Sequence, residues 1–207
     1  MAGAGAGRVV IAGGTGFVGG EVVRLFERLG YETFVISRTP RVNTAKTPAL
    51  FSEGSKSELK NVRTWDDIEV QLFMMVDEWM DTYYKLHVSS QAHGLPSSTV
   101  AVINCCGQNV LDPLHRWNDA FKQKVYNSRV KTNEMLARAI SHAEEPPAAF
   151  IHMSGVGFYP PDSADRPGGA TEESPGGEHD WLAELVKDWE AAAHLPASVS
   201  TRVVSLR

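Results

Sequence analysis

A glycine-rich turn near the amino terminus constrains the fold of this chain more than any other feature. The letters A-G-G-T-G-F-V-G place Gly13, Gly16 and Gly19 at regular spacing directly after the apolar run Arg8–Ala12. A β-branched run of this kind is typical of a buried strand, and the apolar residues after the turn recur at helical spacing as far as Leu29. Strand, glycine turn and helix in this order are typical of a dinucleotide-binding unit.

Each glycine has a physical task in such a unit. Gly13 permits the tight turn, Gly16 lets backbone N–H groups approach a diphosphate, and Gly19 lets helix and strand pack closely. The helix amino terminus then presents N–H donors and a positive dipole end to the anion. A turn that serves packing alone is the alternative. The expected cofactor contacts are Gly13, Gly14, Thr15, Gly16, Phe17, Val18 and Gly19.

The rest of the chain alternates apolar runs with helically periodic segments. This alternation predicts an α/β fold, a doubly wound parallel sheet of the Rossmann type. A chain of 207 residues, 43% of them hydrophobic, is suited to one domain covering residues 1–207. The predicted strands cover 32–36, 62–64, 99–104, 149–153 and 201–206, and the predicted helices cover 118–142 and 180–193.

Residues 39–98 interrupt the alternation. The part from 39 to 60 is polar and rich in Ser, Thr, Pro and Lys, which is typical of a loop. Residues 72–86 carry apolar side chains along one helical stripe, with acidic and basic residues off it. A helix is therefore predicted there, and it either packs on its own domain or binds a protein partner.

Charge and apolar patterning argue against several functions. The net charge is −5 and no Lys/Arg block stands out, so the footprint of a nucleic-acid binder is missing. No apolar run reaches the roughly 20 residues that span a bilayer. The first residues lack a signal or transit pattern, which leaves the cytoplasm as the expected compartment. The seven histidines are scattered without ligand spacing, so no metal site is expected.

The end of the second predicted strand distinguishes NAD from NADP. An acidic residue there binds the adenosine ribose of NAD, whereas this sequence has Ser37 and Arg38. A hydroxyl and a guanidinium suit a 2′-phosphate, because Arg offers charge-assisted and often bidentate bonds. Such contacts contribute about 1.5–3 kcal/mol. We therefore expect NADP(H), with a solvated surface Arg38 as the alternative.

Further motifs recur in the same order in one family. They are G-G-T-G-F-V-G, S-R, V-I-N-C-C-G-Q-N-V, R-W-N-D-A-F-K-Q-K-V-Y-N-S-R-V-K-T, S-G-V-G-F-Y and W-L-A-E-L-V-K-D-W-E-A-A-A. On these motifs, the chain resembles the epimerase family proteins of the atypical, extended-type short-chain dehydrogenase/reductase superfamily, over nearly its whole length outside residues 39–98. The resemblance implies a Rossmann half followed by a substrate half, NADP(H) as cofactor, and a small-molecule substrate of unknown identity.

The same resemblance implies additional cofactor contacts. Cys105 and Cys106 would touch the cofactor through their backbone where the fourth strand ends. Arg129 would face it from the long helix, with Lys124 as a companion. From the residues alone, the two cysteines are interpreted as small side chains that fill a crowded strand end rather than as a redox pair.

The catalytic residues of the wider superfamily are only partly present. Active members use a Ser or Thr after the fifth strand and a Tyr-x-x-x-Lys on the next helix, where Tyr moves the proton during hydride transfer. Ser154 matches the first position, but Trp181 or Leu182 stands where the Tyr belongs and no Lys is aligned. Tyr159 is the candidate that substitutes for it. The pair 189–190 (Trp-Glu) is interpreted as packing and capping groups.

The chain also departs from the family in length. Residues 39–98 are longer than the usual connection, and 70–93 resemble an insertion from an intron or alternative exon. The expected fold lacks most of the substrate half, because the chain ends after the last predicted strand. The expected function is an NADP(H)-dependent oxidoreductase or epimerase. The alternatives are a non-catalytic NADP(H) sensor, a partner-binding protein, or an inactive shortened isoform.

Overall fold

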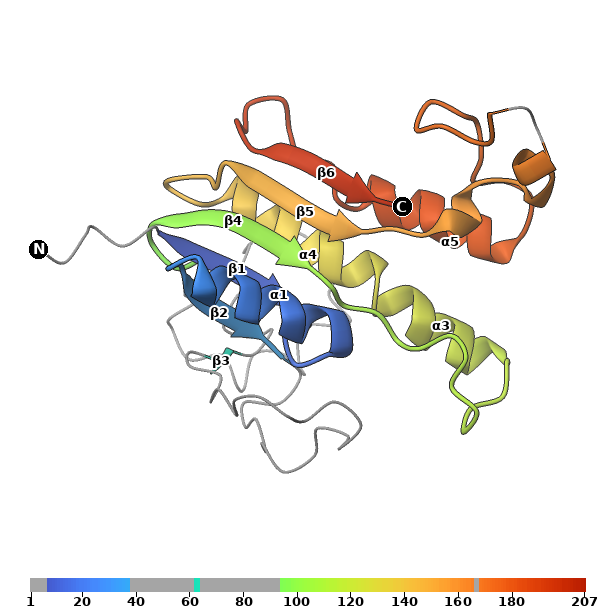
Figure 1. Ribbon diagram of the computed structural model, residues 1–207, viewed down its shortest axis with the longest axis horizontal. Helices are drawn as coiled ribbons and strands as arrows, with labels where there is room; N and C mark the ends of the chain where they lie inside the picture. The colour runs from blue at the N-terminus through green and yellow to red at the C-terminus, as the bar shows by residue number, and fades with distance from the viewer. Residues whose placement is uncertain (1–6, 38–61, 64–93, 166–167) are drawn as a thin grey trace, which may run out of the picture.

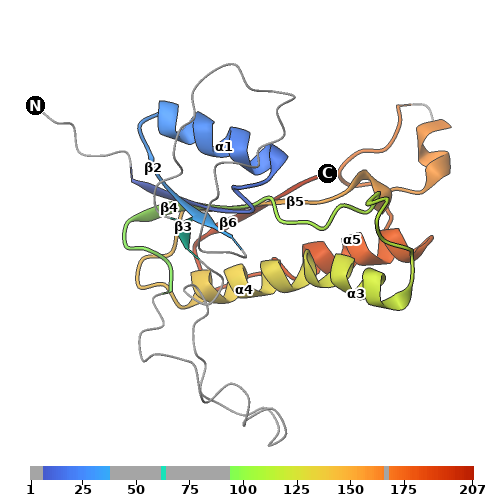
Figure 2. The same cartoon turned by 90° about the horizontal axis from the view of Figure 1, so that it is seen from below.

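Six parallel strands form one twisted sheet with helices on both faces (Figures 1 and 2). The computed structural model describes residues 7–37, 62–63, 94–165 and 168–207. The strands are β1 (Arg8–Ala12), β2 (Glu32–Ile36), β3 (Val62–Arg63), β4 (Thr99–Asn104), β5 (Ala149–Met153) and β6 (Arg202–Leu206). The helices are α1 (Phe17–Arg28), α3 (Asp119–Asn127), α4 (Val130–Ser141) and α5 (Trp181–Ala191), with 3₁₀ turns η3 (Val156–Phe158) and η4 (Pro161–Asp165).

The strand order β3-β2-β1-β4-β5-β6 creates a switch point at the centre of the sheet. The chain runs outward from β1 to β2 and β3, then returns to place β4 against the other side of β1. From β4 it runs outward again to β5 and β6. This order is that of a doubly wound dinucleotide-binding sheet, so the predicted fold class is confirmed.

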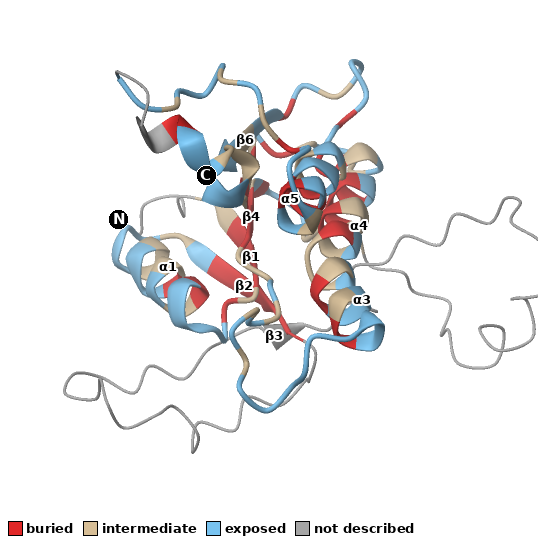
Figure 3. Cartoon of the chain, turned by 90° about the vertical axis from the view of Figure 1, so that its right-hand side faces the viewer, coloured by how far each residue is buried: buried red, intermediate tan, exposed pale blue. Residues whose placement is uncertain are grey.

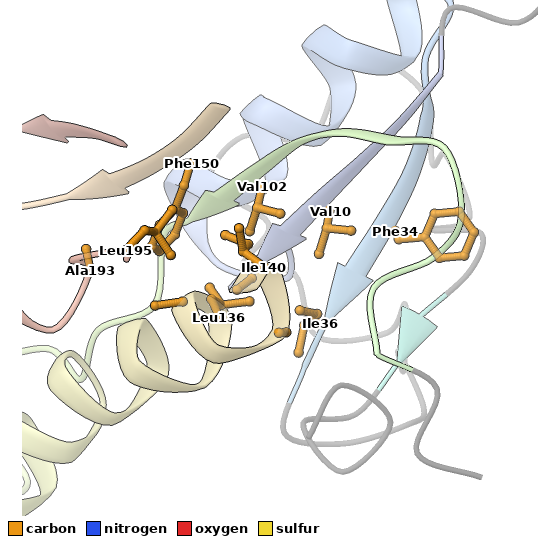
Figure 4. Packing of buried hydrophobic residues seen from close by; sticks show 12 residues of the cluster. Val10, Phe34, Ile36, Val102, Leu136, Ile140, Phe150, Ala193 and Leu195 are labelled. Atoms are coloured by element: carbon orange, nitrogen blue, oxygen red, sulfur yellow. The ribbon is translucent and has the colours of Figure 1, made fainter. Parts of the chain in front are cut away.

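Alternate residues of the central strand β1 are buried against opposite layers. Val9 and Ile11 pack with Val23 of α1, whereas Val10 packs with Leu136 of α4 (Figure 4). Because both faces are covered, the strand is apolar throughout rather than alternating. Burial of each large aliphatic side chain stabilises the fold by about 1.5–3 kcal/mol. Figure 3 shows the buried residues along the sheet and on the inward sides of the helices.

The predicted helix 118–142 is two helices, so that prediction is wrong. The break between α3 and α4 lies at Ser128 and Arg129. The Ser128 hydroxyl donates to the Val125 carbonyl at 2.8 Å and accepts from the Gln108 N–H at 2.8 Å. A side chain that bonds to the helix backbone in this way competes with the regular helical bonds. The apolar periodicity continues through the break, which is why the sequence pattern did not show it.

Helices α3 and α5 each begin with a side-chain cap. The Asn118 side chain accepts from the Phe121 N–H at 2.9 Å, and that of Asp180 accepts from the Ala183 N–H at 2.7 Å. Such caps satisfy one of the free donors at a helix start. The capping residues are thus the first residues of the two predicted helices.

The predictions for residues 39–60, 72–86 and 70–93 lie outside the described residues. These include the possible partner-binding helix and the possible insertion. Within the part of the chain that the structure describes, no helix is long and apolar enough to cross a membrane.

Candidate functional site

The glycine turn lies at the switch point, between the end of β1 and the start of α1. Gly13 has a φ of +76°, and a Cβ there would lie 2.9 Å from the carbonyl carbon and oxygen of Cys105. A Cβ on Gly19 would overlap the carbonyl oxygen of Gly13. Gly16 donates its N–H to that same oxygen at 2.9 Å. Three predicted glycines therefore form one close backbone crossing, in which Gly13 and Gly19 have no room for a side chain.

The amino terminus of α1 follows the glycine turn at the carboxyl edge of the sheet. Its N-cap, Gly16, contributes no side-chain hydrogen bond, and the first turn has no acidic residue. Phe17 and Val18 are exposed there, with relative exposures of 79% and 47%. The positive dipole end of this twelve-residue helix therefore points out of the carboxyl edge of the sheet, and no acidic side chain of its own first turn neutralises it.

The loop after β4 closes the other side of this turn. The Cys105 N–H donates to the Ala12 carbonyl at 2.9 Å, and the Cys106 N–H donates to the Asn104 side-chain oxygen at 3.0 Å. Neither cysteine forms a disulfide. Burial raises the pKa of the Cys105 thiol, which keeps it protonated. Since the thiolate is the reactive form, the structure is consistent with packing rather than redox chemistry at this position.

The two residues predicted to bind a 2′-phosphate follow β2 at the same edge of the sheet. Ser37 is buried at the strand end. Arg38 lies outside the described residues. Because β1 and β2 are parallel and in register from Arg8–Glu32 to Ala12–Ile36, Ser37 lies beside the first glycine of the turn.

Arg129 holds the loop after β4 from the helix break. Its Nη1 donates to the Gln108 carbonyl at 3.0 Å and to the Val125 carbonyl at 3.2 Å. The guanidinium also lies 5.2 Å from the centre of the Trp189 ring and directly against Gly107. Burial lowers the pKa of Arg129. These contacts place its charge at the loop on which the cofactor contact was predicted.

The other predicted basic contact, Lys124, lies on the exposed face of α3. The predicted contact between the cofactor and either Lys124 or Arg129 stays a prediction.

Ser154 and Tyr159, the two candidate catalytic residues, belong to one hydrogen-bonded cluster. The Ser154 hydroxyl donates to Oε1 of Glu190 at 2.5 Å. Arg207 binds both carboxylate oxygens of Glu190, at 2.8 Å each, and its Nη1 donates to the Tyr159 hydroxyl at 2.9 Å. The cluster joins the end of β5, the last turn of α5 and the residue after β6.

Glu190 is charged in this cluster. Burial acts to raise the pKa of its carboxyl, but the hydrogen bonds from Arg207 and Ser154 outweigh it and the pKa is lowered. The hydrogen bond to Glu190 in turn raises the pKa of Arg207. The guanidinium also lies 3.9 Å from the centre of the Phe158 ring. Because Ser154 donates its proton to a carboxylate, its oxygen is left to accept from another group.

The sequence interpretation of residues 189 and 190 was half right. Trp189 is a buried packing residue beside Phe121 and Leu185, as predicted. Glu190 is not a cap, since its carboxylate binds Ser154 and Arg207 instead. Arg207 was not singled out at all. The adjacent β5 and β6 were the available signal, because the ends of parallel neighbours meet at the same edge.

Comparison with known proteins gives consistent matches. Residues 9–180 match the NAD dependent epimerase/dehydratase family. The Homo sapiens epimerase family protein SDR39U1 is 35% identical over 200 residues, which cover 97% of this chain and 53% of the relative. The Bacillus subtilis epimerase family protein YfhF is 24% identical over 202 residues, covering 96% and 53%. The chain thus spans about half the length of these relatives.

Solved structures show the same fold. A crystal structure of human SDR39U1 (isoform 2) with NADPH has a TM-score of 0.71 at 34% identity, covering 97% of this chain and 52% of that one. A nucleoside-diphosphate sugar epimerase from Corynebacterium glutamicum has a TM-score of 0.61 at 23% identity, covering 97% and 33%.

Proposed function

Because the chain belongs to the NAD dependent epimerase/dehydratase family, we propose that it binds NADP(H) across the switch point of its sheet and serves oxidoreductase or epimerase chemistry on a small molecule. The glycine turn carries this proposal. Gly13 and Gly19 have no room for a side chain, and the helix that follows begins without a capping side chain or an acid. That combination suits a diphosphate.

NADP(H) is preferred over NAD(H) for two reasons. Ser37 and Arg38 follow β2, where an acid would favour NAD. The structure of the human relative, 34% identical, is a complex with NADPH. The 2′-phosphate and adenosine half then lie over β2, which leaves the nicotinamide half on the β4 side of the switch point.

Ser154 and Tyr159 are the groups proposed to contact the substrate. The bound nicotinamide supplies hydride chemistry. The Ser154 oxygen accepts a hydrogen bond, since its own proton goes to Glu190. The Tyr159 oxygen accepts from Arg207, so its proton is available to a substrate oxygen. Together these two hydroxyls suit a substrate that carries an alcohol or carbonyl group.

A second candidate function is cofactor binding without turnover. It is favoured by α5, where Trp181 or Leu182 stands in place of the superfamily tyrosine. The positions four residues later are the buried Leu185 and Val186 rather than a lysine. A proton donor held in the usual way is therefore missing from this helix.

Isothermal titration with NADPH and NADH tests the cofactor proposal. NADPH is expected to bind roughly ten- to a hundredfold more tightly, the ratio that corresponds to contacts between a phosphate and charged donors. Arg38→Ala removes most of this preference. Arg28→Ala, at the far end of α1, is the control and keeps it. Equal affinities for the two dinucleotides in the unmodified chain would contradict the proposal.

A further inference from the structure

A network of hydrogen-bonded polar side chains crosses the interior next to the proposed cofactor site. Its core consists of Asn104 at the end of β4, Asn133 on α4 and His152 on β5, with relative exposures of 1%, 0% and 0%. Its far end is Ser205 on β6. This polar network connects four elements of the fold. Its three core members are buried, where unpaired polar groups are costly, whereas Ser205 is exposed.

One end of this polar network holds the loop after β4. The side-chain oxygen of Asn104 accepts from the Cys106 N–H at 3.0 Å. Its Nδ2 donates to Asn133 Oδ1 at 2.8 Å and to Thr132 Oγ1 at 3.0 Å. The backbone fixed in this way is the same segment against which Gly13 packs. A shift in the Asn104 amide therefore moves one wall of the glycine turn.

The other end of the polar network contacts α5 and β6. Asn133 Nδ2 donates to the Trp189 carbonyl at 2.8 Å and lies 3.2 Å from Nδ1 of His152. His152 Nε2 lies 2.8 Å from the Ser205 hydroxyl. Asn133 is thus the junction between α5, β5 and the residue Asn104 that holds the loop.

Backbone groups at both ends fix the orientation of the two asparagine amides. The Cys106 N–H can only donate, so Asn104 presents its oxygen there and its amide nitrogen to Asn133. The Trp189 carbonyl can only accept, so Asn133 presents its nitrogen to α5. His152 Nδ1 lies 3.2 Å from Asn133 Nδ2 and 3.1 Å from the Met153 carbonyl, so the tautomer of the ring decides which of these two bonds it makes. Fully satisfied buried networks of this kind specify one arrangement of the groups that they join.

Apolar side chains of similar size would fill this space without the cost of burying amides. What the polar network adds is a fixed orientation of the loop at Cys106. We propose that Asn133 is a positioning residue for the nicotinamide half of NADP(H), acting through Asn104. This inference rests on the proposed function, because it requires the dinucleotide to extend from β2 across the switch point to the loop after β4.

Two ligands distinguish an effect on the nicotinamide half of the site from an effect on the adenosine half. NADPH occupies the whole site, whereas 2′,5′-ADP carries only the adenosine half and its 2′-phosphate. Both are titrated calorimetrically into the full chain and its variants. Asn133→Ala is expected to weaken NADPH binding roughly three- to tenfold, the loss expected for one hydrogen bond, and to change 2′,5′-ADP binding by less than about twofold.

Asn133→Asp tests whether the bond between Asn104 and Asn133 carries the effect on NADPH affinity. A carboxylate in this position still accepts from Asn104 but no longer donates to the Trp189 carbonyl. NADPH affinity is therefore expected to return close to that of the unmodified chain, although chemical denaturation shows the variant to be destabilised. A role in stability alone does not produce this separation of affinity from stability.

Ile140→Val on the same helix α4 is the control, since Ile140 is fully buried and lies in the hydrophobic core cluster. It is expected to leave both affinities unchanged. Asn104→Asp is the second variant, should Asn133→Ala not fold. It keeps the acceptor for Cys106, loses the donor to Asn133, and is expected to weaken NADPH alone.

Equal weakening of both ligands by Asn133→Ala overturns the inference, as does an Asn133→Asp variant that binds NADPH as poorly as Asn133→Ala. An unmodified chain that binds neither ligand overturns the proposed function itself. Failure of the inference is thus distinguishable from failure of the function on which it rests.

Discussion

Gly19 and Gly20 are neighbours in the first turns of α1, yet their surroundings differ. A Cβ on Gly19 would overlap the Gly13 carbonyl oxygen, whereas a Cβ on Gly20 would make an ordinary contact at 3.7 Å with the Gly14 oxygen. Gly19→Ala is therefore expected to abolish NADPH binding and destabilise the fold. Gly20→Ala is expected to keep binding and raise the free energy of unfolding by up to about 1 kcal/mol, because Ala is the better helix former.

Calorimetric titration with NADPH and urea unfolding of the two variants measure this contrast. NADPH binding by the Gly19 variant with unchanged affinity would show that the backbone crossing is not needed for the site.

At this same scale, the tasks of Gly16 and Gly19 could be predicted from sequence because they depend on Gly13, a few positions away. The Glu190–Arg207 pair could not, since the two residues meet only when α5 and β6 are packed side by side. Asn104 and Asn133 lie in segments that the sequence showed as a strand and a helix, and nothing in an apolar period indicates that their amides face each other.

Among the elements, the described strands of the sheet were predicted with nearly correct bounds, because all of them except β3 contain a short apolar run between turn residues. The interruption between α3 and α4 was missed. The helical period persists across it, and the cause is a contact with the distant loop at Gln108. Helix breaks that depend on a tertiary contact are not encoded in local periodicity.

Ser128→Ala tests the cause of this break. The variant loses the acceptor for the Gln108 N–H and the donor to the Val125 carbonyl. The free energy of unfolding is expected to fall by about 1–3 kcal/mol, because the Gln108 N–H is left without its acceptor. Ser141→Ala is the control, since that hydroxyl bonds only to the Ala137 carbonyl within α4. Equal stability of the two variants in urea unfolding would mean that the loop contact does not hold the break.

For the molecule as a whole, the sheet has two unlike halves. The half with β1, β2 and α1 is built around close backbone contacts that suit a phosphate group. The half with β4, β5 and β6 holds the buried amides, His152 and the Ser154–Glu190–Arg207 cluster. Polar chemistry is thus concentrated on the side proposed for nicotinamide and substrate, while the other side serves cofactor recognition.

His152 makes the stability of the whole fold sensitive to mild acid. Burial lowers its pKa, although the Met153 carbonyl and the negative charge of Glu190 act in the opposite direction. In the unfolded chain the imidazole regains its ordinary pKa near 6.5. As the pH falls below that value, the unfolded state takes up a proton that the folded state does not, so the free energy of unfolding decreases. The decrease from this one group is at most about 1.4 kcal/mol per pH unit and ends once the pH passes below the folded pKa.

Urea unfolding of the chain between pH 5 and pH 8 measures this slope. His152→Gln, which cannot titrate in this range, is expected to be less stable at pH 8 because the bonds to Asn133 and Ser205 are perturbed. Its free energy of unfolding should nevertheless fall less steeply below pH 6.5 than that of the unmodified chain. His142→Gln provides the comparison with an exposed histidine. If His152→Gln and the unmodified chain lose stability in parallel, the buried imidazole is not the group that senses acid, and a protonated His152 would have to be compatible with the bond from Asn133.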